Sequence, residues 1–155
     1  MSIPVRLNGK DVTLDAAPGD TLLEALRRHG SWSSKHGCES GECGACAVMV
    51  DGVTRASCVM LAEQARGRSL TTAEALGTPE HLSRLQRAFV ERGAIQCGFC
   101  TPAMLLVATE LLERCPNPTL AEVKDALSGT LCRCTGYARP VEAVLAAARP
   151  SPAES

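Results

Sequence analysis

Residues 35–46 read Lys-His-Gly-Cys-Glu-Ser-Gly-Glu-Cys-Gly-Ala-Cys and contain three closely spaced cysteines. Four residues separate Cys38 from Cys43, two separate Cys43 from Cys46, and Cys58 follows after eleven more. A C-x4-C-x2-C run followed by a distant cysteine is the plant-type spacing of [2Fe-2S] ligands. The stretch therefore predicts an iron–sulfur site in the first half of the chain.

The glycines within this stretch fit the same interpretation. A cluster held by four thiolates is negatively charged, so its burial requires several N–H groups directed at sulfur. Gly37, Gly41 and Gly44 allow the backbone to curl around such a group where a Cβ atom would intrude. Tetrahedral zinc is the alternative, but its cysteine ligands usually come as two short knuckles, which this spacing does not resemble. The pattern favours iron–sulfur binding.

A second set of four cysteines lies in the other half of the chain. Two residues separate Cys97 from Cys100, and one residue separates Cys132 from Cys134. Each pair directly precedes an expected helix, whose N-terminus offers free N–H groups and partial positive charge to an anionic cluster. Two other interpretations stay open on spacing alone. They are a zinc site of four thiolates and a redox-active dithiol, although the βαβ pattern of thioredoxin-like proteins is missing here.

The first half of the chain combines strand patterns with one helix. Apolar residues alternate on both sides of Asn8-Gly9, a dipeptide that suits a tight hairpin turn. Thr21 and Glu24 form a capping-box pair at the start of a helix that Gly30 ends. A second hairpin is expected from strands at 47–50 and 53–59, joined by Asp51-Gly52. These elements predict a small domain of strands and one helix over residues 1–77, and an α+β class for the whole chain.

Helical periodicity dominates the second half. Pro102 suits the first turn of a helix, where its missing N–H costs nothing, and Thr119 with Glu122 forms another capping box. Four helices are predicted, over about 82–93, 101–115, 119–129 and 140–148. They predict a helical bundle over residues 78–150. Residues 151–155 are expected to be a disordered tail.

Composition narrows the class of protein. The net charge of -1 excludes the strongly basic footprint of a nucleic-acid binder, and no apolar run approaches the roughly 20 residues of a membrane span. An apolar leader is missing at the N-terminus, so we expect a cytoplasmic protein whose nine cysteines stay reduced. The glycine-rich motifs that bind dinucleotides or nucleoside triphosphates are missing as well. We therefore expect no catalytic residue on this chain.

Three motifs together resemble a known family. They are residues 35–46, Gln96-Cys-Gly-Phe-Cys-Thr-Pro102 and Leu131-Cys-Arg-Cys-Thr-Gly-Tyr137. In this order they are similar to the iron–sulfur subunit of the molybdenum hydroxylases, the family of xanthine dehydrogenase, aldehyde oxidoreductase and carbon monoxide dehydrogenase. The resemblance extends over nearly the whole chain and implies two [2Fe-2S] clusters. It also implies a ferredoxin-like β-grasp domain followed by a four-helix bundle.

The resemblance implies a role for each cysteine set. The ligands of a cluster on the flavin side would be Cys38, Cys43, Cys46 and Cys58. The ligands of a cluster on the molybdenum side would be Cys97, Cys100, Cys132 and Cys134. Gln96 matches a family position that hydrogen-bonds the pterin, and Cys134 matches a ligand that also touches it. Ala103 and Thr130 depart from the family pattern, where glycine and asparagine are frequent, but neither is a ligand.

Electron transfer is the function that the resemblance implies. The chain would be the small subunit of a molybdenum-containing oxidoreductase, relaying single electrons from a molybdopterin centre through both clusters to FAD or another acceptor. A large molybdopterin-binding subunit and an FAD-binding medium subunit would complete a heterotrimer. Two alternatives are a standalone two-cluster ferredoxin or redox sensor, and a zinc-stabilised interaction protein.

Overall fold

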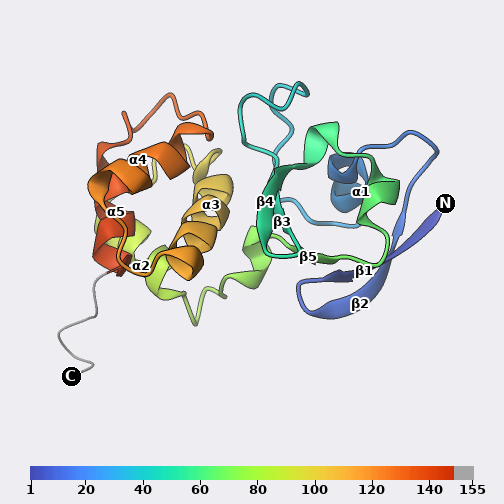
Figure 1. Ribbon diagram of the computed structural model, residues 1–155, viewed down its shortest axis with the longest axis horizontal. Coiled ribbons are helices and arrows are strands. Elements are labelled where there is room, and N and C mark those ends of the chain that lie inside the picture. The colour runs from blue at the N-terminus through green and yellow to red at the C-terminus, as the bar shows by residue number, and fades with distance from the viewer. Residues whose placement is uncertain (149–155) are drawn as a thin grey trace.

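The computed structural model describes residues 1–148, and within them it has a five-stranded mixed sheet and five α-helices (Figure 1). The α+β class is therefore as predicted, while the predicted tail at 151–155 lies outside the described residues. The strands are β1 Ser2–Leu7, β2 Lys10–Asp15, β3 Ala47–Val50, β4 Val53–Ala56 and β5 Ser69–Thr71. The helices are α1 Leu22–Arg28, α2 Arg84–Glu91, α3 Thr101–Arg114, α4 Leu120–Ser128 and α5 Ala138–Ala148. None of these helices is long and apolar enough to cross a bilayer.

The first hairpin and the first helix form as the sequence predicts. β1 and β2 pair in antiparallel register, with Asn8 and Gly9 at positive φ angles of 52° and 80° in the turn. Thr21 and Glu24 make the capping box, in which the Glu24 carboxylate accepts a hydrogen bond from the Thr21 N–H at 2.7 Å. Gly30 follows α1 with φ 103°. Local sequence thus determines both elements.

The sheet has the order β2-β1-β5-β3-β4. β5 pairs parallel to β1 and antiparallel to β3, so it joins the two hairpins into one sheet. The sequence does not predict β5, because three residues are too few to show an alternating pattern. Its pairing of Leu70 with Leu7 also depends on contact between distant parts of the chain.

The second hairpin is shorter than predicted. β4 ends at Ala56, and the predicted extension to Val59 is wrong because residues Ser57–Val59 form a 3-10 turn, η1. Ser57 is buried, and its hydroxyl donates to the carbonyl oxygen of Cys46 at 2.6 Å. This bond bends the chain so that Cys58 lies in the interior beside the glycine-rich loop.

Two apolar cores stabilise the two halves. One lies between the sheet and α1, and its fully buried members include Ile3, Leu14, Leu22, Leu26, Val48 and Leu70. The other lies among α2–α5, and its buried members include Phe89, Met104, Ala108, Val123, Leu127 and Val144. Burial of each large aliphatic side chain stabilises the fold by about 1.5–3 kcal/mol, before the entropy of the chain is counted.

Capping residues set the bounds of the helices in the second half. Ser83 and Gln86 form a capping box at the start of α2. Thr119 and Glu122 form the predicted capping box at the start of α4. Pro102 occupies the first turn of α3. The four predicted helices are all present, although α5 begins at Ala138, before the predicted start at 140.

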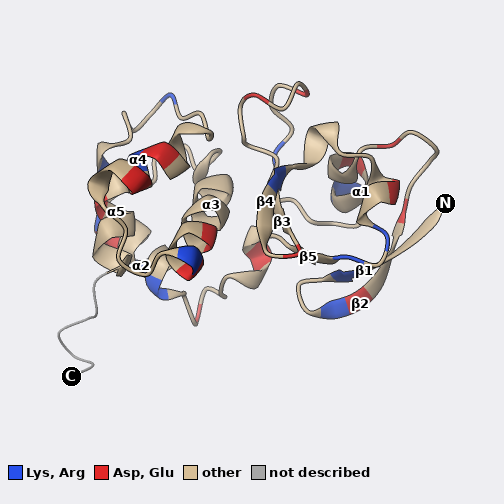
Figure 2. Ribbon diagram, viewed as in Figure 1, with Lys and Arg blue, Asp and Glu red and all other residues tan. Residues whose placement is uncertain are grey.

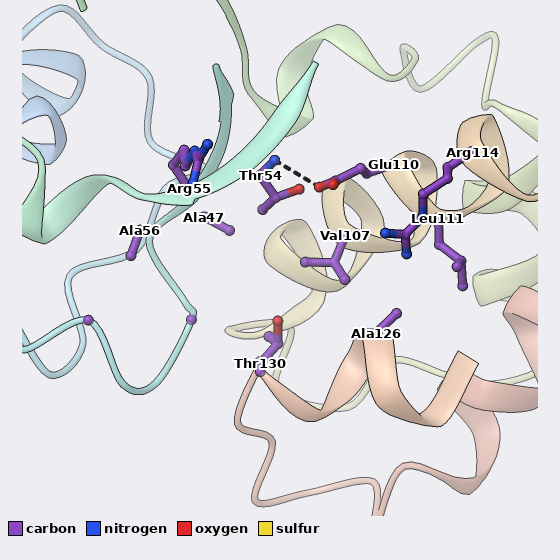
Figure 3. Close-up of a pocket in the computed structure, with 13 residues that line it drawn as sticks. Ala47, Thr54, Arg55, Ala56, Val107, Glu110, Leu111, Arg114, Ala126 and Thr130 are labelled. Atoms are coloured by element: carbon purple, nitrogen blue, oxygen red, sulfur yellow. Dashed lines mark hydrogen bonds between the residues drawn. The ribbon is translucent and has the colours of Figure 1, made fainter. Parts of the chain in front are cut away.

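The two halves meet where α3 packs against β3 and β4. Figure 3 shows Glu110 extending from α3 to the edge of β4, where its carboxylate accepts a hydrogen bond from the Thr54 N–H at 2.8 Å. A crevice of about 310 Å³ lies beside this contact, with Val107 and Arg114 of α3 on one wall. The contact fixes the helices against the edge of the sheet, next to the cysteine-bearing loops.

Candidate iron–sulfur centres

The first four cysteines extend from the interior to the surface. Cys46 directly precedes β3 and Cys58 lies in η1, and their side chains are only 2% and 8% exposed. Cys43 is half-buried and Cys38 is exposed on the loop that follows α1. The fold therefore brings a strand start, a 3-10 turn and one loop to the same place.

Backbone N–H groups are directed at Cys38. The N–H groups of Ser40 and Cys43 donate to its Sγ at 3.4 and 3.3 Å. Hydrogen bonds from the Ser40 hydroxyl first, and then from these two N–H groups, lower the pKa of the Cys38 thiol to about 5. Since the thiolate is the form that binds metal, this environment favours a ligand.

Cys58 shows that the remaining thiols of this set are close together. Burial and a hydrogen bond with the Cys46 thiol raise the pKa of Cys58 to about 11, although the N–H of Gly41 opposes the shift. The charge of Cys38 contributes to the same increase. The structure thus gathers all four predicted residues, because Cys43 is joined to Cys38 through its N–H. With its pKa raised in this way, Cys58 would take the thiolate form beside Cys46 only if a bound cation offset the charge.

The second set of cysteines lies at the N-terminal ends of two helices. Cys100 is the N-cap residue of α3 and is buried, and Cys97 lies exposed three residues before it. Cys132 and Cys134 lie in the loop between α4 and α5. This is the arrangement that the sequence predicts, with each pair immediately before a helix.

Tyr137 holds the loop of the second pair in place. Its hydroxyl accepts a hydrogen bond from the Cys132 N–H at 2.9 Å and donates one to the carbonyl oxygen of Thr130 at 3.0 Å. The Thr135 hydroxyl lies 3.1 Å from the Sγ of Cys132 and accepts from the Tyr137 N–H. The sequence alone does not indicate this role for Tyr137, although the residue closes the third motif.

The thiols of the second set also interact with one another. Burial would raise the pKa of Cys132, but hydrogen bonds from Thr135, and from Cys100 and Cys134, lower it to about 7. Burial and the adjacent Cys132 raise the pKa of Cys100 to about 12. At Cys134 the N–H of Cys97 lowers the pKa, but the Cys97 thiol, burial and Cys132 together raise it more. All four predicted residues are therefore brought together.

The contacts between thiols occur in pairs. Within residues 1–148, no three His, Cys, Asp or Glu side chains are arranged to hold a single metal ion. The interacting pairs are Cys46 with Cys58, Cys100 with Cys132, and Cys97 with Cys134. Two thiolates for each iron is the ligand arrangement of a [2Fe-2S] cluster. The pairs, with the N–H donors directed at sulfur, fit such a cluster in both places.

A direct hydrogen bond links the two sites. The N–H of Leu131, the residue before Cys132, donates to the carbonyl oxygen of Cys43 at 2.9 Å. Gly44 and Gly129 approach so closely here that a Cβ atom on Gly44 would lie 2.1 Å from the Gly129 oxygen. The two cysteine-bearing loops are therefore in backbone contact.

Comparison with known proteins identifies the family. Residues 5–73 match the family model of the 2Fe-2S iron-sulfur cluster binding domain, and residues 72–145 match that of the [2Fe-2S] binding domain. The chain is 49% identical over 146 residues to the nicotine 6-hydroxylase small subunit of Paenarthrobacter nicotinovorans, covering 94% of this chain and 88% of that protein. The chain belongs to the iron–sulfur small subunits of the molybdenum hydroxylases.

Other relatives of this iron–sulfur subunit agree. It is 43% identical over 147 residues to the xanthine dehydrogenase iron-sulfur-binding subunit of Escherichia coli O157:H7, covering 94% of this chain and 92% of that protein. A chain of the crystal structure of quinoline 2-oxidoreductase from Pseudomonas putida 86 matches it with a TM-score of 0.92 and 42% identity, covering 96% of this chain and 93% of that one. The resemblance inferred from three motifs is confirmed.

The two cysteine-bearing loops of this iron–sulfur subunit carry different charged residues. Figure 2 shows acidic positions on the loop of the first set and a basic position on the loop of the second. These are Glu39 and Glu42 in the first loop and Arg133 in the second. Gln96 and Cys134 are both exposed, and Cys97, which follows Gln96 in the chain, interacts with Cys134.

Proposed function

We propose that eight cysteines of this subunit hold two [2Fe-2S] clusters and relay single electrons from a molybdopterin centre in a large subunit to FAD in a medium subunit. The ligands of the first cluster are Cys38, Cys43, Cys46 and Cys58, and those of the second are Cys97, Cys100, Cys132 and Cys134. One observation carries the proposal: each set of thiols is gathered into one place, and the Leu131–Cys43 hydrogen bond joins the two loops.

The residues of this chain have three tasks in such a relay. A bound [2Fe-2S] cluster accepts and releases one electron at a time. The N–H groups at Cys38 and the Thr135 hydroxyl at Cys132 stabilise negative charge on sulfur. The backbone from Cys132 through Leu131 to Cys43 provides a short path for the electron. The hydrogen bond between Leu131 and Cys43 joins the two loops, so the electron does not have to cross an empty gap there.

The exposed ends of the two sites suit contacts with other subunits. Gln96 and Cys134 are both exposed, and Cys97, the residue after Gln96, interacts with Cys134, which supports the proposal that this end meets the pterin. Cys38 is exposed on the other loop, which supports a flavin on that side. The complete enzyme would then be a heterotrimer, and a cytoplasmic location would keep its cysteines free of disulfides.

We also propose the finer description of the architecture. Residues 1–77 would form a ferredoxin-like β-grasp domain, since the sheet and α1 share one core. Residues 78–150 would form a four-helix bundle, since α2–α5 share another core. The helices α2 and α5 pack together closely, and α4 contacts both α3 and α5.

Electron paramagnetic resonance of the dithionite-reduced full chain tests the cluster assignment, with iron and zinc quantified on the same sample. Two distinct S = 1/2 signals with about four irons per chain are expected for two clusters. Cys43→Ser should remove one signal and leave the other. Cys115→Ser is the matched control, because Cys115 lies outside both sets, and it should leave both signals. One signal with zinc in the remaining site would contradict the proposal.

Co-expression with a molybdopterin subunit and a flavin subunit tests the assembly. If the relay is complete, molybdenum, flavin and iron should co-elute with the small subunit in gel filtration. About four irons per small subunit are expected, the content of two [2Fe-2S] clusters. A small subunit that carries both clusters but elutes alone would favour a standalone ferredoxin or redox sensor.

A further inference from the structure

The loops of the two cysteine sets meet along a seam, which we define by Gly37, Cys43, Gly44, Phe99 and Leu131. A Cβ atom placed on Gly37 would lie 2.8 Å from the Sγ of Cys43 and 4.0 Å from the Cε1 of Phe99. The sulfur and the edge of the aromatic ring therefore border the same small space above Gly37. Only a residue without a side chain leaves that space free for both.

Phe99 belongs to one site and reaches the other. It lies in the sequence between Cys97 and Cys100 of the second set, yet its Cε1 lies only 4.0 Å from where a Cβ atom on Gly37, in the loop of the first set, would be. Phe99 is 46% exposed, so about half of the residue is covered by neighbouring parts of the chain. A residue that only separates two ligands in the sequence needs no aromatic ring. Aromatic residues are also rare in this chain, which has only three others of the Phe, Trp and Tyr types.

We propose that Phe99 is a positioning residue for the first cluster. Its ring closes the seam and keeps water from the Cys43 side of the cluster held by the first set. The solvent exposure of a cluster is one of the factors that set its reduction potential, because water stabilises the extra negative charge of the reduced form. The ring thus holds the potential of the first cluster lower than an open seam would. This inference rests on the proposed function.

Phe99→Ala in the full chain opens the seam. A redox titration followed by electron paramagnetic resonance should show the reduction equilibrium of the first cluster shifted about tenfold toward the reduced form, which is about 59 mV for one electron. The second cluster should shift less, although Phe99 is adjacent to its ligand Cys100. Phe99→Tyr keeps the ring and should restore the potential of the first cluster.

Val90→Ala is the control, because it removes an exposed apolar side chain from α2, away from the seam. It should leave both potentials unchanged. If Phe99→Ala alters only the second cluster, or neither, Phe99 acts as a local spacer and the inference is wrong.

If Phe99→Ala loses iron, the redox titration is repeated with Phe99→Leu, which keeps an apolar side chain smaller than the phenyl ring. A shift of the first cluster in the same direction supports the inference, and an unchanged potential overturns it. The proposed function fails separately, because that failure appears in the unsubstituted chain as the lack of two [2Fe-2S] signals.

Discussion

Tyr137 shows what one residue contributes to a cysteine-bearing loop. Its backbone has a positive φ of 66°, which costs a non-glycine residue about 1–2 kcal/mol. The hydroxyl offsets this cost, since it satisfies both the Cys132 N–H and the carbonyl oxygen of Thr130. The ring packs against the core of the helical half. Tyr137 therefore fixes Cys132 relative to the end of α4.

Tyr137→Phe keeps the ring and removes only the hydroxyl. Two partly buried backbone groups lose their partner, so we expect a loss of about 1–3 kcal/mol in the free energy of unfolding. The electron paramagnetic resonance signal of the second cluster should broaden, while that of the first stays the same. Urea unfolding and spectroscopy on one preparation check both effects. Unchanged stability and an unchanged signal would show that the hydroxyl does not hold the loop.

At the scale of elements, a carboxylate connects the loop after α1 to the 3-10 turn η3, Ala73–Ala75. Glu74 accepts hydrogen bonds from both the hydroxyl and the N–H of Ser33, the latter at 2.9 Å. Burial alone would raise the pKa of Glu74, but the hydrogen bonds from Ser33 and Thr72 outweigh it and lower the pKa. The start of the cysteine-bearing loop is thus tied to the segment that leads into the helical half.

The lowered pKa of Glu74 predicts a stability effect that depends on pH. Its contribution is full above the ordinary glutamate pKa and is lost as the pH falls through the lowered value in the folded chain. Glu74→Gln should therefore lower the melting temperature at pH 7, and the difference from the unsubstituted chain should shrink in acid. Thermal melts of both proteins from pH 7 downward check this, with the exposed Glu80→Gln as control. A difference that stays constant with pH would contradict it.

The same elements show what can be predicted from the sequence. The first hairpin, the capped helices and the close cysteine spacings within each motif follow from patterns within a few residues of one another. β5 does not, because its pairing with β1 joins residues that are far apart in the chain. The turn at Ser57 and the Leu131–Cys43 bond depend on contacts between separate segments. For that reason the two cysteine motifs can be recognised from the sequence, but the connection between them cannot.

At the scale of the whole molecule, the two halves are held together by backbone contact as well as by side chains. Gly44 has a positive φ of 71° and lies against the backbone of Gly129. Gly67 has almost the same φ, 72°, and would meet nothing within 4 Å if it carried a Cβ atom. The two glycines therefore share a backbone requirement and differ only in the close approach.

A comparison of substitutions at Gly44 and Gly67 predicts how much the contact between the halves contributes to the free energy of unfolding. Both Gly44→Ala and Gly67→Ala carry the cost of a positive φ, so their difference isolates the steric clash. Gly44→Ala should be less stable than Gly67→Ala by about 1–3 kcal/mol, the usual cost of overpacking. Equal melting temperatures for the two variants would show that the halves adjust without cost.

The Glu110 contact with Thr54 has a consequence for the subunit before it meets its partners. β4 is an edge strand, and an unpaired strand edge is a template for aggregation with another copy. The Glu110 carboxylate occupies the Thr54 N–H, and α3 covers the strand beside it. At the opposite edge, β2 has charged residues at Lys10, Asp11 and Asp15. Both margins of the sheet are thus protected against strand exchange while the newly made chain awaits assembly.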